Sequence, residues 1–182
     1  VPVGGEWQPE DATAVFDLRT DPPRHMGNLP FATSGIKRIG DTVFAIIDDN
    51  SAPIGSDSRY LATVDLAEEP GRSRVLQRLT LSGRIAVMPW SDHPLGDLIQ
   101  LPDGRLVMPV IAGATAPGSD SHLALEVLRP DGQGGYASEG EGPPFQSTPY
   151  GSPSLLNLGD WVAYISGASE ANGVLNLART EP

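Results

Sequence analysis

The sequence contains no cysteine, and Lys37 is the one lysine among its twelve basic residues. The absence of cysteine excludes a disulfide framework, a thiolate nucleophile and a metal site with cysteine ligands. No apolar run approaches the length of a membrane-spanning helix. Acidic residues outnumber basic ones and leave a formal net charge of -11. This charge argues against nucleic acids and anionic membranes as partners, because phosphate binding relies on Lys and Arg to displace counterions.

Glycine and proline are abundant, with 21 and 18 residues, and 39% of the residues are hydrophobic. This composition is typical of a chain with many turns and few long helices. The length of 182 residues predicts a single domain over residues 1–182. The sequence opens on Val1, as a processed chain, a fragment or a protein freed from a tag would. If a signal peptide was cleaved, the protein is exported, and we expect a secreted or periplasmic location.

The sequence repeats itself about every sixty residues. Segment 52–62 (APIGSDSRYLA) returns as segment 116–124 (APGSDSHLA). Further landmarks recur at a similar spacing: Pro30, Ile39 and Gly40, then Pro94, Leu101 and Gly104, then Pro149, Leu158 and Gly159. A period of this length that consists of strands indicates propeller blades, in which each small sheet buries its faces against its neighbours.

Each repeat begins with the pattern of an antiparallel hairpin. Residues 34–47, 97–111 and 154–166 are apolar runs interrupted by a glycine. The turns are predicted at Gly40, Gly104 and Gly159, because glycine supplies the positive φ that a tight hairpin turn requires. A third strand follows in each repeat, at 60–66, 123–128 and 174–178.

The outer strands are less regular. We predict a fourth strand at 74–79 in the first repeat and a marginal one near 135–137 in the second, while the third repeat has none. Strand 13–18 is predicted to fill this vacancy in its own chain or in a second copy, which would remove an open sheet edge. Segment 84–88 fits no blade position and is interpreted as an extra strand or a remnant. The glycine-rich stretch around 139–141 is interpreted as a surface loop.

The predicted fold is therefore all-β, with about three four-stranded antiparallel blades. The repeats cover approximately residues 29–82, 93–138 and 148–180. Three blades are fewer than the four that a closed ring normally needs. We therefore expect a homo-oligomer or a fragment of a longer chain, unless the chain holds more than three blades.

The hairpins also resemble a known group of proteins. Segment 151–167 (GSPSLLNLGDWVAYISG), followed by 173–180 (GVLNLART), resembles a blade of the glycosidase propellers, which include the five-bladed arabinanase and invertase group and the six-bladed sialidases. Segment 98–106 (LIQLPDGRL) is similar to sialidase-type strands. The Ser-x-Asp pieces at 56–58 and 119–121 lack the Gly and Trp of a sialidase Asp-box. The resemblance implies a propeller that binds or hydrolyses a glycan.

Propellers bind ligands where the loops that enter the innermost strands converge. In this sequence those loops carry basic, acidic and aromatic candidates for ligand binding: Arg24, His25, Trp90, Asp92, His93, Asp97 and Tyr150. Sugars stack on aromatic rings and donate hydroxyl hydrogens to carboxylates. Hydrolysis further requires two carboxyl groups roughly 5 to 9 Å apart, for which Asp92 and Asp97 are the candidate catalytic pair. The alternative interpretation is that these residues form turns and solvated loops.

Two other possibilities stay open at the level of sequence. Asp48 and Asp49, with Asp57 in the same loop, are oxygen ligands of the kind that Ca²⁺ prefers, although their spacing follows no known loop. No other cofactor is expected. The expected partner is a glycan or another small polar ligand. The alternative function is that of a non-catalytic propeller scaffold for protein–protein interaction, kept soluble by its acidic surface.

Overall fold

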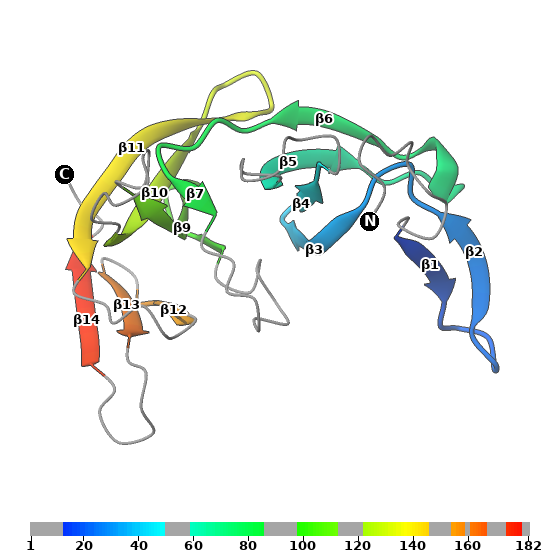
Figure 1. The fold of residues 1–182 in the computed structure, drawn as a ribbon, viewed down its shortest axis with the longest axis horizontal. Helices are drawn as coiled ribbons and strands as arrows, with labels where there is room; N and C mark the ends of the chain where they lie inside the picture. The colour runs from blue at the N-terminus through cyan, green and yellow to red at the C-terminus, as the bar shows by residue number, and fades with distance from the viewer. Residues whose placement is uncertain are drawn as a thin grey trace, which may run out of the picture. The chain divides into compact units, whose positions relative to one another are not determined.

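The computed structural model describes residues 13–49, 59–85, 98–112, 122–145, 154–158, 161–166 and 174–179. Over these residues the fold is all-β, as predicted, and consists of antiparallel sheets with one short 3-10 helix, η2 (Pro70–Arg72) (Figure 1). No helix within these ranges is long and apolar enough to cross a membrane. The chain divides into two compact units, residues 1–78 and residues 79–182.

The main sheet of the first unit has four strands in sequence order. They are β3 (Thr33–Ile39), β4 (Thr42–Asp48), β5 (Arg59–Asp65) and β6 (Arg74–Arg78), each antiparallel to the next. Gly40 adopts a φ of 57° in the turn between β3 and β4. The first predicted hairpin, its glycine turn and the two strands that follow it are therefore confirmed.

Strand β4 lies at the centre of this sheet and is buried on both faces. On one face its side chains join the apolar cluster Leu29, Phe31, Val43, Ala45, Ile47, Ala62 and Val64. On the opposite face Phe44 and Ile46 are fully buried. The run Val43–Ile47 is continuously apolar for this reason, since a strand buried on both faces shows no polar alternation.

The N-terminal strand forms a small sheet within the first unit. Strand β1 (Ala14–Asp17) pairs antiparallel with β2 (Arg24–Asn28) and forms a two-stranded sheet. Val15 packs against the apolar cluster of the first unit, and the backbone N–H of Leu29 donates to the carbonyl of Thr13 at 2.9 Å. The pairing of this strand with the third repeat stays a prediction, and its observed partner is β2. A short loop closes β1 onto β2 at a smaller entropic cost than pairing with a distant strand.

The larger sheet of the second unit repeats the same order of strands. Its path runs from β8 (Ile99–Gln100) through β9 (Leu106–Ala112) and β10 (His122–Pro130) to β11 (Tyr136–Phe145). Gly104 adopts a φ of 86° in the turn between β8 and β9, which confirms the second predicted hairpin.

Strand β11 is ten residues long, although only a marginal strand was predicted there. The interpretation of residues 139–141 as a surface loop is wrong, because all three lie within this strand. The Glu139 carboxylate pairs with the guanidinium groups of Arg105, at 3.8 Å, and of Arg129. These ion pairs and the free edge of β10 order a segment that has little strand propensity of its own.

The extra segment at 84–88 contributes a short strand to the same sheet. Strand β7 (Arg84–Ile85) pairs with β9 opposite Val110 and Ile111, on the edge of β9 that also carries β8. A side chain at Gly83 would place its Cβ atom 2.7 Å from the carbonyl oxygen of Ile111. Glycine therefore allows the backbone to approach β9 closely enough to pair with it.

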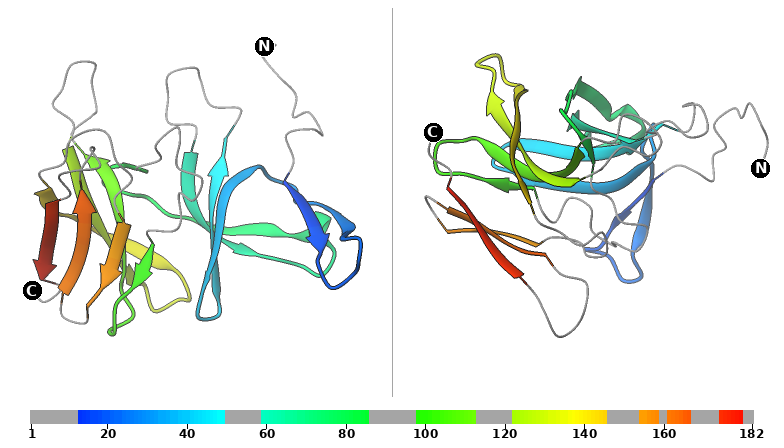
Figure 2. Two further views of the ribbon diagram at one scale, coloured as in Figure 1. Left: turned by 90° about the horizontal axis from the view of Figure 1, so that it is seen from below. Right: turned by 60° about the vertical axis from the view of Figure 1, so that its left-hand side comes forward.

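A three-stranded sheet completes the second unit. Strands β12 (Ser154–Asn157), β13 (Trp161–Ser166) and β14 (Val174–Arg179) pair in sequence order, so the third predicted hairpin is confirmed. Its predicted turn residue, Gly159, lies outside the described residues. The two sheets lie alongside each other (Figure 2) and share an apolar cluster of Leu101, Val107, Leu125 and Val162, with Ile99 and Leu155 packed against it.

A buried carboxylate joins three segments of the larger sheet. Glu126 of β10 is fully buried. The backbone N–H of Ser82 donates to its Oε2 at 3.1 Å, and the hydroxyl groups of Ser82 and Ser138 donate to Oε2 and Oε1 respectively. The carboxylate thus links β10 to β11 and to the segment that leads into β7. Sequence reasoning missed this residue, although a single Glu inside the apolar run of residues 123–128 is a sign of a buried acid.

Replacing Ser138 by alanine tests this arrangement. The Ser138→Ala variant leaves one carboxylate oxygen of Glu126 without its hydroxyl donor, and we expect the free energy of unfolding to fall by about 1–3 kcal/mol. Urea denaturation monitored by circular dichroism measures this loss. The matched control is Ser34→Ala, because the Ser34 hydroxyl is 3.4 Å from its acceptor and contributes less. Equal stability of the two variants would contradict the proposed role of Ser138.

Candidate functional site

A polar cluster lies at one end of the first sheet, where β3 begins, β4 ends and β5 begins. We name it the Asp48 cluster; it consists of Ser34, Asp48 and Arg59. Asp48 and Arg59 are directly opposed across the two strands. The Asp48 Oδ1 atom accepts a hydrogen bond from Arg59 Nε at 2.9 Å and one from the Ser34 hydroxyl at 3.4 Å. The antiparallel order of the strands is what brings these three residues to one end of the sheet.

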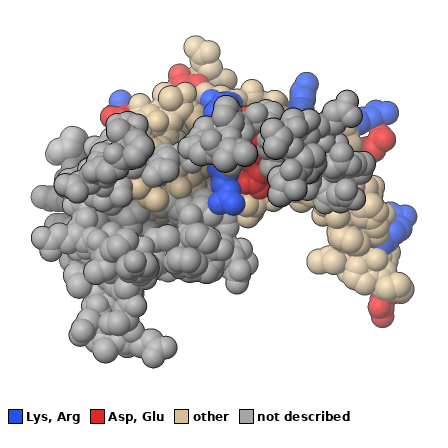
Figure 3. Space-filling view, in the orientation of Figure 1, with Lys and Arg blue, Asp and Glu red and all other residues tan. Residues whose placement is uncertain are grey.

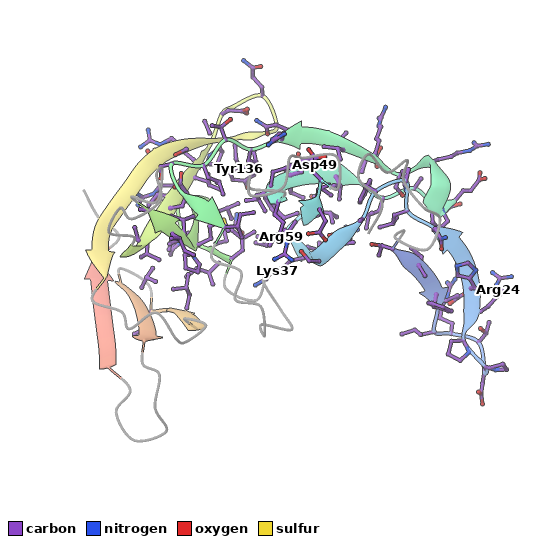
Figure 4. All side chains as sticks on the ribbon, viewed as in Figure 1. Arg24, Lys37, Asp49, Arg59 and Tyr136 are labelled. Carbon is purple, nitrogen blue, oxygen red and sulfur yellow. The ribbon has the colours of Figure 1, made fainter. Side chains whose placement is uncertain are left out.

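The Asp48 cluster contains one of the residues that were considered as Ca²⁺ ligands in the sequence. Asp48 and Asp49 stand at the end of β4, and Figure 4 shows Asp49, Arg59 and Lys37 within the first unit. Asp57, the third expected ligand, lies outside the described residues. Because a guanidinium group lies 2.9 Å from the Asp48 carboxylate, the geometry favours an ion pair there over a divalent cation. In the part of the chain that the structure describes, no three His, Asp or Glu side chains gather as a metal site would require.

Tyr60 follows Arg59 on β5 and therefore points to the opposite face of the sheet. Its ring packs against the apolar cluster, and the guanidinium carbon of Arg78 lies 4.2 Å from the ring centroid. Burial raises the pKa of the Tyr60 phenol, the Asp49 charge adds to this effect, and Arg78 opposes it. The stacked guanidinium covers one face of the ring, so Tyr60 is a structural residue rather than an open platform for a sugar.

Arg24 and His25, two of the predicted ligand-binding residues, lie on β2. The His25 Nε2 atom is 3.0 Å from Asn28 Oδ1, and the His25 ring lies 5.2 Å from the ring of Phe16. Arg24 approaches the Asp17 carboxylate at 4.0 Å. Figure 4 shows Arg24 on the β1–β2 hairpin, well separated from Lys37, Asp49 and Arg59. The structure therefore brings neither residue to the Asp48 cluster.

The remaining predicted site residues lie outside the described residues: Trp90, Asp92, His93, Asp97 and Tyr150. Their places in the chain are still informative. Residues 86–97 connect β7 to β8, and residues 146–153 connect β11 to β12. Strands β8 and β12 contact each other within the second unit. The connections that carry these five residues therefore lead into two neighbouring strands.

The charged side chains of the described surface are largely paired with opposite charges. Figure 3 shows basic and acidic groups beside one another at several places. Exposed pairs include Arg72 with Glu69 and Arg74 with Asp65, and Arg19 pairs with the largely covered Asp17. Such exposed pairs contribute little to stability, but they leave a surface of mixed sign.

The chain shows no significant match to a family model, a curated protein or a solved structure.

Two carboxylates, those of Asp17 and Asp103, have a lowered pKa because an arginine two residues later binds each of them. Hydrogen bonds from the side chain and the backbone N–H of Arg19 lower the pKa of Asp17 to about 2. Partial desolvation would raise the pKa of Asp103, but hydrogen bonds from the backbone and side chain of Arg105 hold it below its ordinary value. A general acid in catalysis needs the opposite shift. The lowered pKa values therefore argue against a general-acid role for Asp17 and Asp103.

The pKa of Asp17 gives a testable pH dependence. Because the folded-state pKa lies below the ordinary value of 3.8, its ionised form stabilises the fold above pH 3.8, and this contribution disappears as the pH falls through 2. In the Arg19→Ala variant, NMR titration should show the Asp17 pKa returning toward 3.8. The control Arg72→Ala, which removes a different exposed pair, should leave the titration unchanged. An Asp17 pKa that does not respond to Arg19→Ala would contradict the assignment.

Proposed function

We propose that this chain forms part of a β-propeller that binds a carbohydrate at the end of the sheets where the innermost strands begin. The proposal is supported by the recurring order of the sheets. The orders β3–β4–β5–β6 and β12–β13–β14 and the path β8–β9–β10–β11 each add the next strand along the chain, and β7 is an additional strand on the edge of β9 that carries β8. This is the order of strands in a propeller blade.

The observation that carries the proposal is the packing of the two sheets in the second unit. Ile99 of β8 and Leu155 of β12 pack against one apolar cluster, which also includes Val107 of β9 and Val162 of β13. The first strands of the two sheets contact each other, and both second strands contribute to the same apolar cluster. Equivalent strands of neighbouring blades meet in this way in a propeller, because each blade buries its face against the next.

The chemistry of the binding site follows from the residues that precede β8 and β12. Trp90 and Tyr150 supply aromatic faces, while Asp92, His93 and Asp97 supply hydrogen-bonding groups. This combination suits a polar ring with one apolar face, as a sugar has. Asp92 and Asp97 become a catalytic pair if their carboxyl groups stand at the separation that glycoside hydrolysis requires. Fold alone does not decide between binding and hydrolysis, so the two are separated by experiment.

Charge removal at Asp97 tests the proposal. We expect a glycan array to identify ligands of the wild-type chain, and calorimetry to show an affinity at least about tenfold weaker for Asp97→Asn, because one charge-assisted hydrogen bond is lost. The matched control is Asp41→Asn. Asp41 lies in the turn between β3 and β4, at the end of the first sheet opposite to the end where β3 begins. Asp41→Asn should bind as the wild type does.

Release of a chromogenic group from an aryl glycoside distinguishes hydrolysis from binding. Loss of turnover in Asp97→Asn and in Asp92→Asn, with binding retained in one of them, indicates a catalytic pair. Binding without turnover in the wild type indicates a lectin-like module. If no glycan binds, or if Asp41→Asn weakens binding as much as Asp97→Asn, the carbohydrate proposal is wrong and the scaffold alternative takes its place.

A further inference from the structure

Strand β1 repeats strand β5 at an offset of 48 residues, from Ala14 to Ala62, and β2 repeats β6 at an offset of 50 residues, from Arg24 to Arg74. Both segments begin with alanine and continue two residues later with an apolar side chain, Phe16 or Val64, followed by Asp-Leu. The register of both hairpins shifts at the same place, between Val15 and Phe16 in the first and between the corresponding residues in the second. A shift at the same position is evidence of structural equivalence, because bulges depend on local backbone geometry.

A cross-strand ion pair also recurs in the two hairpins. Asp17 is directly opposite Arg24, with the charged groups 4.0 Å apart. Asp65 is directly opposite Arg74, with the charged groups 3.3 Å apart. Strand β1 is therefore the equivalent of β5, and β2 is the equivalent of β6. The β1–β2 hairpin, a two-stranded sheet, thus matches the outer half of the four-stranded sheet β3–β4–β5–β6.

The two hairpins differ in their neighbours, because only β5–β6 is accompanied by an inner pair of strands, β3 and β4. Strand β5 pairs with β6 on one edge and with β4 on the other, whereas β1 pairs with β2 alone among the described strands. The side chain exposure follows this difference. Val64 is 4% exposed, while its equivalent Phe16 is 53% exposed. Ala62 is fully buried, while its equivalent Ala14 is exposed. A core position of one hairpin is thus open to solvent in the other.

We propose that the free edge of β1 binds a β-hairpin that lies outside these 182 residues, whose second strand pairs antiparallel with β1 as β4 pairs with β5. Strand addition to an open edge satisfies its backbone N–H and C=O groups, and the side chains determine the register. By equivalence with Ala45, Phe44 and Val43 opposite Ala62, Thr63 and Val64, the added strand places apolar side chains opposite Ala14, Val15 and Phe16. The occupant is therefore an apolar strand of the β4 type.

A second copy of this chain does not fit this role. The described inner pairs, β3–β4, β8–β9 and β12–β13, already pair with their own third strands, β5, β10 and β14. A second copy would have to break one of these pairings before it could donate an inner hairpin. The missing half must therefore come from a hairpin with no third strand of its own.

A peptide with the sequence of residues 33–48 serves as the probe, because it carries the β3–β4 hairpin that occupies the equivalent edge. We expect the full chain to bind this peptide saturably by fluorescence anisotropy. Phe16→Asp should weaken the affinity at least about tenfold, because it places a charge against the apolar side chains of the added strand. The matched control is Leu76→Asp on β6, a residue that is 59% exposed. Leu76→Asp should bind as the wild type does.

Disulfide trapping tests the register in which the peptide pairs with β1. Because the chain has no cysteine of its own, a disulfide can form only at the introduced residues. The Ala14→Cys variant should form a disulfide with a peptide that carries Ala45→Cys at least about tenfold faster than with one that carries Val43→Cys, because only the first pair is directly opposed. No peptide binding, equal trapping of the two peptides, or equal effects of Phe16→Asp and Leu76→Asp would each overturn the proposal. Self-association of the chain in sedimentation experiments, abolished by Phe16→Asp, would assign the edge to a second copy instead.

Discussion

Burial of the second strand of each larger sheet on both of its faces is the constraint on which the rest of the structure depends. A strand such as β4 or β9 removes its backbone from water, so both of its edges must be paired. Strand β4 has β3 on one edge and β5 on the other, and β9 has β10 on one edge with β7 and β8 on the other. The short strand β7 and the close approach at Gly83 serve this requirement, because β8 alone covers only part of that edge of β9.

The same constraint arranges the polar residues. Polar groups within the sheets carry local partners, as Glu126 does with Ser82 and Ser138 and as Asp48 does with Arg59. Chemistry that needs unpaired groups is then left to the connections at the ends of the strands, where the backbone meets solvent. The segments before β8 and β12 are such connections, and the two strands into which they lead contact each other.

The hairpins could be predicted from sequence because their determinants are local. Gly40 and Gly104 provide a positive φ between two apolar runs, and both stand in the turns of the observed hairpins. Strand β11 could not be predicted in its full length, because its Gly, Pro and Glu residues favour loops and its order comes from pairing with β10. The places of Arg24 and His25 were likewise not predictable, since the sequence does not show that their segment folds back on β1.

The sequence by itself determined the all-β class, the period of the repeat and the position of the described glycine turns, because side-chain alternation and positive φ act over a few neighbouring residues. Only the tertiary structure decided which strands pair and which side chains meet. In that structure β1 pairs with β2, Asp48 lies opposite Arg59, and the buried Glu126 accepts a hydrogen bond from Ser138. Pairing between strands depends on the competition between loop closure and burial over the whole chain, and no local pattern of residues reports the outcome of that competition.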